Sequence, residues 1–105
     1  MPDILADLAQ TITDRRGADP SLSYVAKLLA GGTPLAARKL GEEAVETVVA
    51  ALSGDDAALT AEAADLLFHL LVLLESRNVT LDAVLAELDR REGVSGLAER
   101  AARTP

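Results

Sequence analysis

Four acidic side chains in two short motifs are the residues of this sequence best suited to bind a metal ion. The motifs are Glu43-x-x-Glu46 and Glu62-x-x-Asp65. In each motif the two carboxylates are three positions apart, so they lie on the same face of an α-helix. Two antiparallel helices that each offer such a pair can bring the carboxylates together around a divalent cation. Carboxylate oxygens without thiolates or clustered imidazoles suit Mg²⁺ or Mn²⁺.

The helix that carries the first motif has further charged residues on the same face. At about 100° per residue, Lys39, Glu42, Glu43 and Glu46 fall within roughly a third of the helix circumference. Taken alone, this face is more typical of an ordinary solvated helix surface than of a metal site. Asp65 does not fit that interpretation well, because the residues that follow it are almost all apolar.

The segment after Asp65 predicts the central helix of the fold. Residues 66–74 are apolar except for His69, so a helix here is apolar on every side and must be buried. The run is shorter than the roughly 20 apolar residues of a membrane span, which predicts a helical core and no membrane. His69 either supports Asp65, one turn earlier, or fills the core. Di-iron bundles use Glu-x-x-His pairs on two helices, so a single histidine argues against them.

Cap residues and apolar spacing predict an all-α bundle of four to five helices. We expect helices at residues 4–16, from Ser21 or Ser23 to Gly31, at residues 34–52, at residues 56–77 and at residues 81–91. The helical part, residues 1–92, forms one domain. The Ala- and Arg-rich tail, residues 93–105, is expected to be a frayed helix or disordered.

Composition narrows the possible functions. The net charge of −7 argues against broad binding to nucleic acid or to anionic membranes, since both need positive surface. The chain has no cysteine, which excludes a disulfide framework and a thiolate metal site. The acidic start of the sequence is not followed by an apolar signal segment, so we expect a cytoplasmic protein.

Three segments together carry a family resemblance. They are SYVAKL at residues 23–28, KLGEEAVE at residues 39–46 and ADLLFHLLVLL at residues 64–74. They resemble the phosphoribosyl-ATP pyrophosphatase family of the all-α, MazG-like nucleotide pyrophosphohydrolases, and the likeness runs from about Leu5 to Arg91. The sequence has Phe68 where the family commonly has tyrosine.

The resemblance implies a Mg²⁺-dependent enzyme with Mn²⁺ as a substitute metal. The implied reaction hydrolyses 1-(5-phosphoribosyl)-ATP to 1-(5-phosphoribosyl)-AMP and pyrophosphate, the second step of L-histidine biosynthesis. On this hypothesis the metal ligands are Glu43, Glu46, Glu62 and Asp65, with His69 behind Asp65. The catalytic candidates are Glu42, Glu43 and Glu46, and Glu42 is the candidate base that orients the water. The candidates for binding the substrate phosphates are Lys27, Arg38, Lys39 and Arg91.

The resemblance also implies a homodimer, and the apolar central helix favours one because short helices cannot cover all of its sides. Two other functions remain open. One is a pyrophosphohydrolase of the same superfamily that removes non-standard nucleoside triphosphates. The other is a helical dimerisation module without catalysis, in which the acidic face is only solvated surface.

Overall fold

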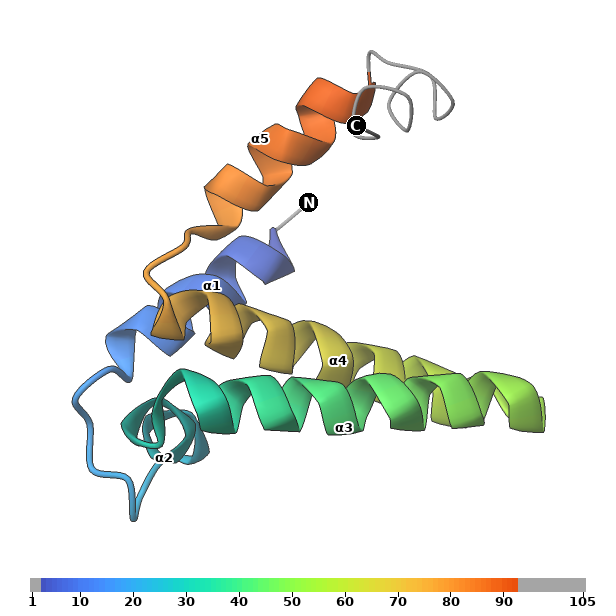
Figure 1. Ribbon diagram of the computed structural model, residues 1–105, viewed down its shortest axis with the longest axis horizontal. Coiled ribbons are helices and arrows are strands. Elements are labelled where there is room, and N and C mark those ends of the chain that lie inside the picture. The colour runs from blue at the N-terminus through green and yellow to red at the C-terminus, as the bar shows by residue number, and fades with distance from the viewer. Residues whose placement is uncertain (1–2, 93–105) are drawn as a thin grey trace.

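The computed structural model describes residues 3–92, which form five α-helices and contain no strand (Figure 1). The helices are α1 (Ile4–Asp14), α2 (Tyr24–Ala30), α3 (Gly32–Ser53), α4 (Asp56–Ser76) and α5 (Leu81–Glu92). The all-α prediction is confirmed. The tail predicted at residues 93–105 lies outside the described residues.

Side-chain caps begin the helices where the sequence predicts them. Asp3, Ser23 and Asp55 each accept a hydrogen bond from a backbone N–H in the first turn of α1, α2 and α4. The predicted ends differ by one or two residues. For example, α1 ends at Asp14, and α3 begins at Gly32, before the predicted Thr33-Pro34 start. Shifts of this size are normal at helix termini.

Helices α3 and α4 form a long antiparallel hairpin, and α1 and α2 pack against one end of it (Figure 1). The core lies at that end. It consists of Ile12 from α1, Leu28 from α2, Ala36 from α3 and the pair Leu71 and Val72 from α4. Burial of these aliphatic side chains is the main favourable term that holds the four helices together.

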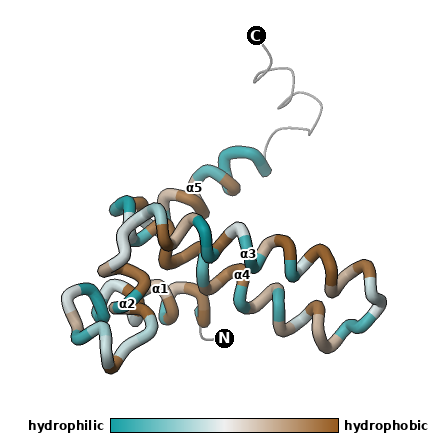
Figure 2. The backbone as a smooth tube through the Cα atoms, turned by 60° about the horizontal axis from the view of Figure 1, so that its bottom comes forward, coloured by the Kyte–Doolittle hydropathy of each residue, from teal (hydrophilic) through white to brown (hydrophobic). Residues whose placement is uncertain are grey.

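The other end of the hairpin has no covering helix within the described residues. Its apolar side chains on α3 are between 58% and 84% exposed, and the outer half of α3 is largely hydrophobic (Figure 2). These side chains are Val45, Val48, Val49 and Leu52. Leu67, near the middle of α4, is also exposed. Helices α1 and α2 reach only the C-terminal half of α4, so a single chain leaves part of the hairpin uncovered, as its short helices lead us to expect (Figure 1).

Helix α4 is also long and apolar enough to cross a membrane, judged by length and composition alone. The sequence prediction counted only the uninterrupted apolar run and so missed this. The finding is weak evidence for a membrane span, because the core helix of a soluble protein meets the same criterion.

Candidate metal-binding site

The antiparallel packing of α3 and α4 brings three of the four predicted metal ligands together. Carboxylate oxygens of Glu43, Glu62 and Asp65 lie within 4.8 Å of one another. Glu43 and Glu62 are half-buried between the helices, and Asp65 is exposed at the edge. We call these three residues the acid cluster.

Glu46, the fourth predicted ligand, lies beside the acid cluster on α3. The pKa of Glu62 is raised to about 7. The largest cause is a hydrogen bond with the Glu46 carboxylate, because this bond favours the protonated form of Glu62. Desolvation and the Glu43 carboxylate act in the same direction. The pKa of Glu43 is also raised, first by desolvation and then by repulsion from Glu46. Glu46 is therefore close enough to the acid cluster to oppose the ionisation of Glu43 and Glu62.

Two oxygens of the acid cluster lack the hydrogen bonds that buried oxygens normally have. Glu43 Oε2 and Glu62 Oε2 are buried without a hydrogen-bond partner among the described residues. A buried acceptor without a partner is costly, and a buried carboxylate is more so. A divalent cation would remove this cost, since it binds carboxylate oxygens and favours the ionised acids. The oxygen-only donor set fits a hard cation such as Mg²⁺.

Thr47 is a residue of the site that sequence reasoning missed. Its Oγ1 lies 2.8 Å from the backbone oxygen of Glu43, one turn earlier, and 3.2 Å from the backbone oxygen of Glu62 on α4. One hydroxyl proton can be donated to either carbonyl. Thr47 therefore links α3 to α4 at the two residues whose carboxylates must meet. The i to i+4 spacing from Glu43 is visible in the sequence, but the contact across the hairpin is not.

The structure places Glu42 outside the acid cluster. Its carboxylate is exposed and forms ion pairs with Lys39, at 3.4 Å, and Arg38, at 3.7 Å. These three predicted site residues therefore contact one another on the outer face of α3. Exposed ion pairs of this kind are weak, so a phosphate can compete with Glu42 for both bases.

The remaining basic candidates lie on other helices. Lys27 is exposed on α2. Arg91 forms an ion pair with Glu87, at 3.0 Å, on α5, a helix that projects away from the α3–α4 hairpin (Figure 1). Within the described residues, the structure does not bring Arg91 to the acid cluster.

His69 is buried, and its ring connects two helices. Its Nδ1 lies 2.7 Å from the backbone oxygen of Asp65, and its Nε2 lies 3.0 Å from the Tyr24 hydroxyl on α2. The contact with Asp65 is thus to the backbone and not to the carboxylate. His69 both fills space in the core and supports the turn of α4 that carries Asp65.

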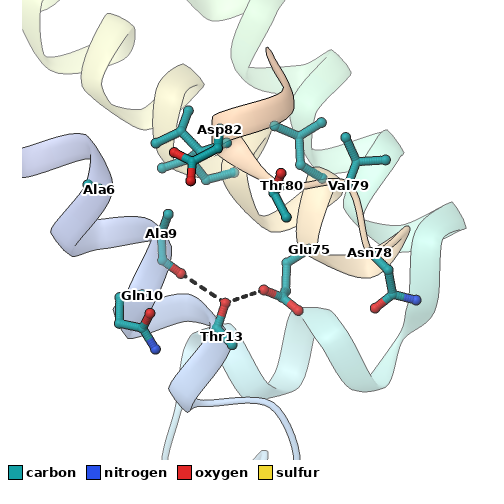
Figure 3. A pocket seen from close by; sticks show the side chains of 12 residues that line it. Ala6, Ala9, Gln10, Thr13, Glu75, Asn78, Val79, Thr80 and Asp82 are labelled. Atoms are coloured by element: carbon teal, nitrogen blue, oxygen red, sulfur yellow. Dashed lines mark hydrogen bonds between the residues drawn. The ribbon is translucent and has the colours of Figure 1, made fainter. Parts of the chain in front are cut away.

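A cavity of about 490 Å³ lies elsewhere, between α1, the end of α4 and the start of α5 (Figure 3). Glu75 on its wall accepts hydrogen bonds from Thr13 and Arg16, which fasten α1 to α4. Glu75 is 13 residues beyond Glu62, or roughly 20 Å along the helix. The cavity is therefore separate from the acid cluster.

An all-α hairpin with a carboxylate cluster between its helices defines a class of helical proteins suited to bind a divalent cation and, through it, phosphate groups. Comparison with known sequences narrows the class. Residues 5–92 match the family described as phosphoribosyl-ATP pyrophosphohydrolase, so the chain belongs to that family.

Similar curated proteins carry the name phosphoribosyl-ATP pyrophosphatase. The protein from Rhizorhabdus wittichii is 64% identical, over 98% of this chain and 97% of its own. The protein from Erythrobacter litoralis is also 64% identical, over 94% and 95% of the two chains. The protein from Dinoroseobacter shibae is 58% identical, over 95% and 98%. The family resemblance of the three sequence segments is thereby confirmed.

The raised pKa of Glu62 predicts how stability depends on pH without metal. Between about 4.5, the ordinary value, and about 7, the folded protein binds more protons at Glu62 than the unfolded chain does. The free energy of unfolding should therefore fall as pH rises through this range. In Glu62→Gln this fall should be smaller. Urea titrations in EDTA between pH 4.5 and 8 measure it, and Glu42→Gln is the control because Glu42 lies outside the cluster. Equal pH dependence in wild type and Glu62→Gln would contradict the prediction.

The position of Thr47 predicts a difference between two substitutions of similar size. Thr47→Val removes the hydroxyl that links the helices, and we expect it to lower the free energy of unfolding by about 1 kcal/mol and to weaken Mg²⁺ binding. Thr47→Ser keeps the hydroxyl and should bind Mg²⁺ nearly as wild type does. Chemical denaturation and calorimetric Mg²⁺ titration test this, and a Thr47→Val variant with normal Mg²⁺ affinity would show that the link does not position the acids.

Proposed function

We propose that the protein hydrolyses 1-(5-phosphoribosyl)-ATP to 1-(5-phosphoribosyl)-AMP and pyrophosphate, the second step of L-histidine biosynthesis. The observation that carries the proposal is the acid cluster with its two unpartnered carboxylate oxygens, in a chain of the phosphoribosyl-ATP pyrophosphohydrolase family. Hydrolysis of a phosphoanhydride develops negative charge on both sides of the broken bond. A site that binds a divalent cation can neutralise this charge and is therefore suited to the reaction.

The proposed cofactor is Mg²⁺, with Mn²⁺ as a substitute. Glu43, Glu62 and Asp65 would hold it, joined by Glu46 at the edge of the cluster. When bound, the cation would neutralise charge on the phosphates and orient the substrate for attack.

The protein's own residues would activate the attacking water and bind the phosphates. Glu46 is exposed beside the acid cluster, where its carboxylate is suited to accept a proton from the attacking water. Glu42, one turn earlier, is the alternative base. Arg38, which is exposed, and Lys39, which is partly buried, lie next to Glu42 and would bind the leaving phosphates in its place. Lys27 on α2 is a further phosphate-binding candidate.

We also propose that the protein is a cytoplasmic homodimer. The exposed apolar side chains at the outer end of the hairpin are three or four positions apart on α3, at Val45, Val48, Val49 and Leu52, so they share one face of that helix. An apolar surface of this kind is typical of an interface. Lipid is a poor alternative cover, since the same part of α4 carries Glu62 and Asp65, and acidic residues inside a membrane are costly. A second copy can cover the apolar side chains and leave the acids in water.

The metal assignment predicts the effect of an isosteric change. Asp65→Asn removes one ligand charge without changing side-chain size, so activity on phosphoribosyl-ATP should fall by at least about a hundredfold. Arg77→Ala, an exposed change at the end of α4, should have almost no effect. Pyrophosphate release is measured with and without Mg²⁺, and near-normal turnover by Asp65→Asn would refute the assignment.

The same assay separates the alternative functions. Release of pyrophosphate from dCTP or dUTP but not from phosphoribosyl-ATP would identify an enzyme that removes non-standard nucleotides. A protein that neither hydrolyses any of these substrates nor binds Mg²⁺ would be the dimerisation module.

The dimer proposal predicts that a charge on the outer hairpin dissociates the protein. Val49→Asp should give a monomer in light scattering at micromolar concentration, because a buried unpaired carboxylate at an interface is costly. Leu22→Asp, at a more exposed position in the loop before α2, is the control and should remain dimeric. A wild-type protein that is monomeric without detergent would remove the proposal.

A further inference from the structure

The chain has one tyrosine, one phenylalanine and one histidine, and all three meet at a single place. The Tyr24 ring stacks on the Phe68 ring with centroids 6.0 Å apart and an interplanar angle of 17°. Phe68 contacts His69 edge to face, at 4.9 Å and 89°. We call these three residues the ring cluster. It joins α2 to α4 one turn after Asp65, at the edge of the candidate metal site.

The ring cluster is not simply part of the hydrophobic core. His69 is only 5% exposed, whereas Tyr24 is 51% exposed. The exposed part of Tyr24 is accessible to a ligand. The Tyr24 hydroxyl contacts His69, whose Nδ1 contacts the backbone oxygen of Asp65 in the acid cluster.

The orientation of the Tyr24 ring is set by a chain of hydrogen bonds. A carbonyl oxygen only accepts, so the contact between His69 Nδ1 and the Asp65 backbone oxygen, at 2.7 Å, places a proton on Nδ1. In the neutral imidazole Nε2 is then an acceptor, and the Tyr24 hydroxyl donates to it at 3.0 Å. The Tyr24 hydroxyl thus donates its hydrogen to His69, and this hydrogen bond fixes the Tyr24 ring against α4, the helix that carries Asp65.

Lys27 lies on the same side of α2 as Tyr24. The two residues are three positions apart and are therefore neighbours on the helix surface. Both are exposed. An aromatic face next to an ammonium group can bind a nucleotide, with the base on the ring and a phosphate on the amine.

We propose that Tyr24 binds the adenine base of the substrate by stacking, and that His69 is a positioning residue that holds the Tyr24 ring for this contact. The proposal rests on the function proposed above and names the part of the protein that recognises the base.

The charge on the adenine ring of phosphoribosyl-ATP lets the face of a tyrosine ring distinguish this substrate from other nucleotides. Ribose attached at N1 leaves the adenine ring positively charged while N6 keeps both hydrogens. A cation is attracted to the electron-rich face of an aromatic ring, and more strongly than a neutral base is. Tyr24 would therefore favour 1-substituted adenine over the bases of ordinary nucleoside triphosphates.

Base binding can be tested without turnover by NMR of protein labelled with ¹³C-tyrosine. The sequence has one tyrosine, so all labelled ring signals belong to Tyr24. The probes are 1-methyl-AMP, AMP and ribose 5-phosphate, each titrated into the full chain with Mg²⁺. We expect 1-methyl-AMP to shift the Tyr24 signals saturably, AMP to do so with about tenfold weaker affinity, and ribose 5-phosphate to leave them unchanged. No shift with 1-methyl-AMP, or the same shift with ribose 5-phosphate, would overturn the proposal. Equal affinities for AMP and 1-methyl-AMP would overturn its charge preference.

Kinetics on phosphoribosyl-ATP test the same contact in the enzyme. Tyr24→Leu should raise KM about tenfold, the usual scale for loss of one stacked base, with little change in kcat or in Mg²⁺ dependence. Leu22→Ala is the control, since Leu22 is also exposed near the start of α2 but lies outside the ring cluster. A wild type that releases no pyrophosphate would refute the proposed function, whereas an active wild type with a normal KM in Tyr24→Leu would refute only this inference.

The positioning role of His69 is tested by a double-mutant cycle. Tyr24→Phe and His69→Leu break the same hydrogen bond, so each should raise KM by a similar factor of a few. The double variant should raise it no further. Independent, additive effects would mean that His69 acts on the fold and not through Tyr24. Should His69→Leu not fold, a Tyr24→Phe variant with wild-type KM and wild-type affinity for 1-methyl-AMP would itself show that the hydrogen bond is not needed.

Discussion

The close packing of α3 against α4 is the constraint on which the rest of the structure depends, because it forces acidic side chains from both helices into one space. Hydrogen bonding with Glu46 and desolvation raise the pKa of Glu62, and desolvation and repulsion from Glu46 raise the pKa of Glu43. Each of these two acids also has a buried oxygen without a partner among the described residues. Such an arrangement opposes folding, so it persists only because other contacts hold the two helices together. Thr47, between the backbones of Glu43 and Glu62, is one of those contacts.

The two ends of the α3–α4 hairpin differ in how they are covered. At one end α1 and α2 enclose Leu71 and Val72, and the ion pair between Arg16 and Glu75 fastens α1 in place. At the other end the apolar side chains of α3 remain exposed in the single chain. The acid cluster lies between the two ends. A second copy on the exposed end, as we propose, would complete the support of the cluster from both directions.

Helix α2 connects the core to the site. Leu28 is buried in the core, while Tyr24, at the start of the same helix, is tied to the buried His69 and remains half exposed. A seven-residue helix would be marginal by itself, and its position depends on these tertiary contacts. It carries the exposed Tyr24 ring, which is linked through His69 to the turn of α4 that holds Asp65, and the exposed amine of Lys27.

The helices and the acidic face were determined by the sequence alone, since local physics decides them. The cap at Asp3 and the three-residue spacing of the carboxylates act within one helix, so they are visible before any packing is known. The sequence left the caps of α2 and α4 open between Ser21 and Ser23 and between Asp55 and Asp56, and the structure shows Ser23 and Asp55. Only the tertiary structure decided which residues meet across helices. It brought Glu43 on α3 together with Glu62 and Asp65 on α4 and left Arg91 on a projecting helix (Figure 1). It also placed His69 against Tyr24 on α2. These outcomes depend on the rotation and register of one helix against another, and on how far short helices reach along α4, which no single-helix pattern encodes.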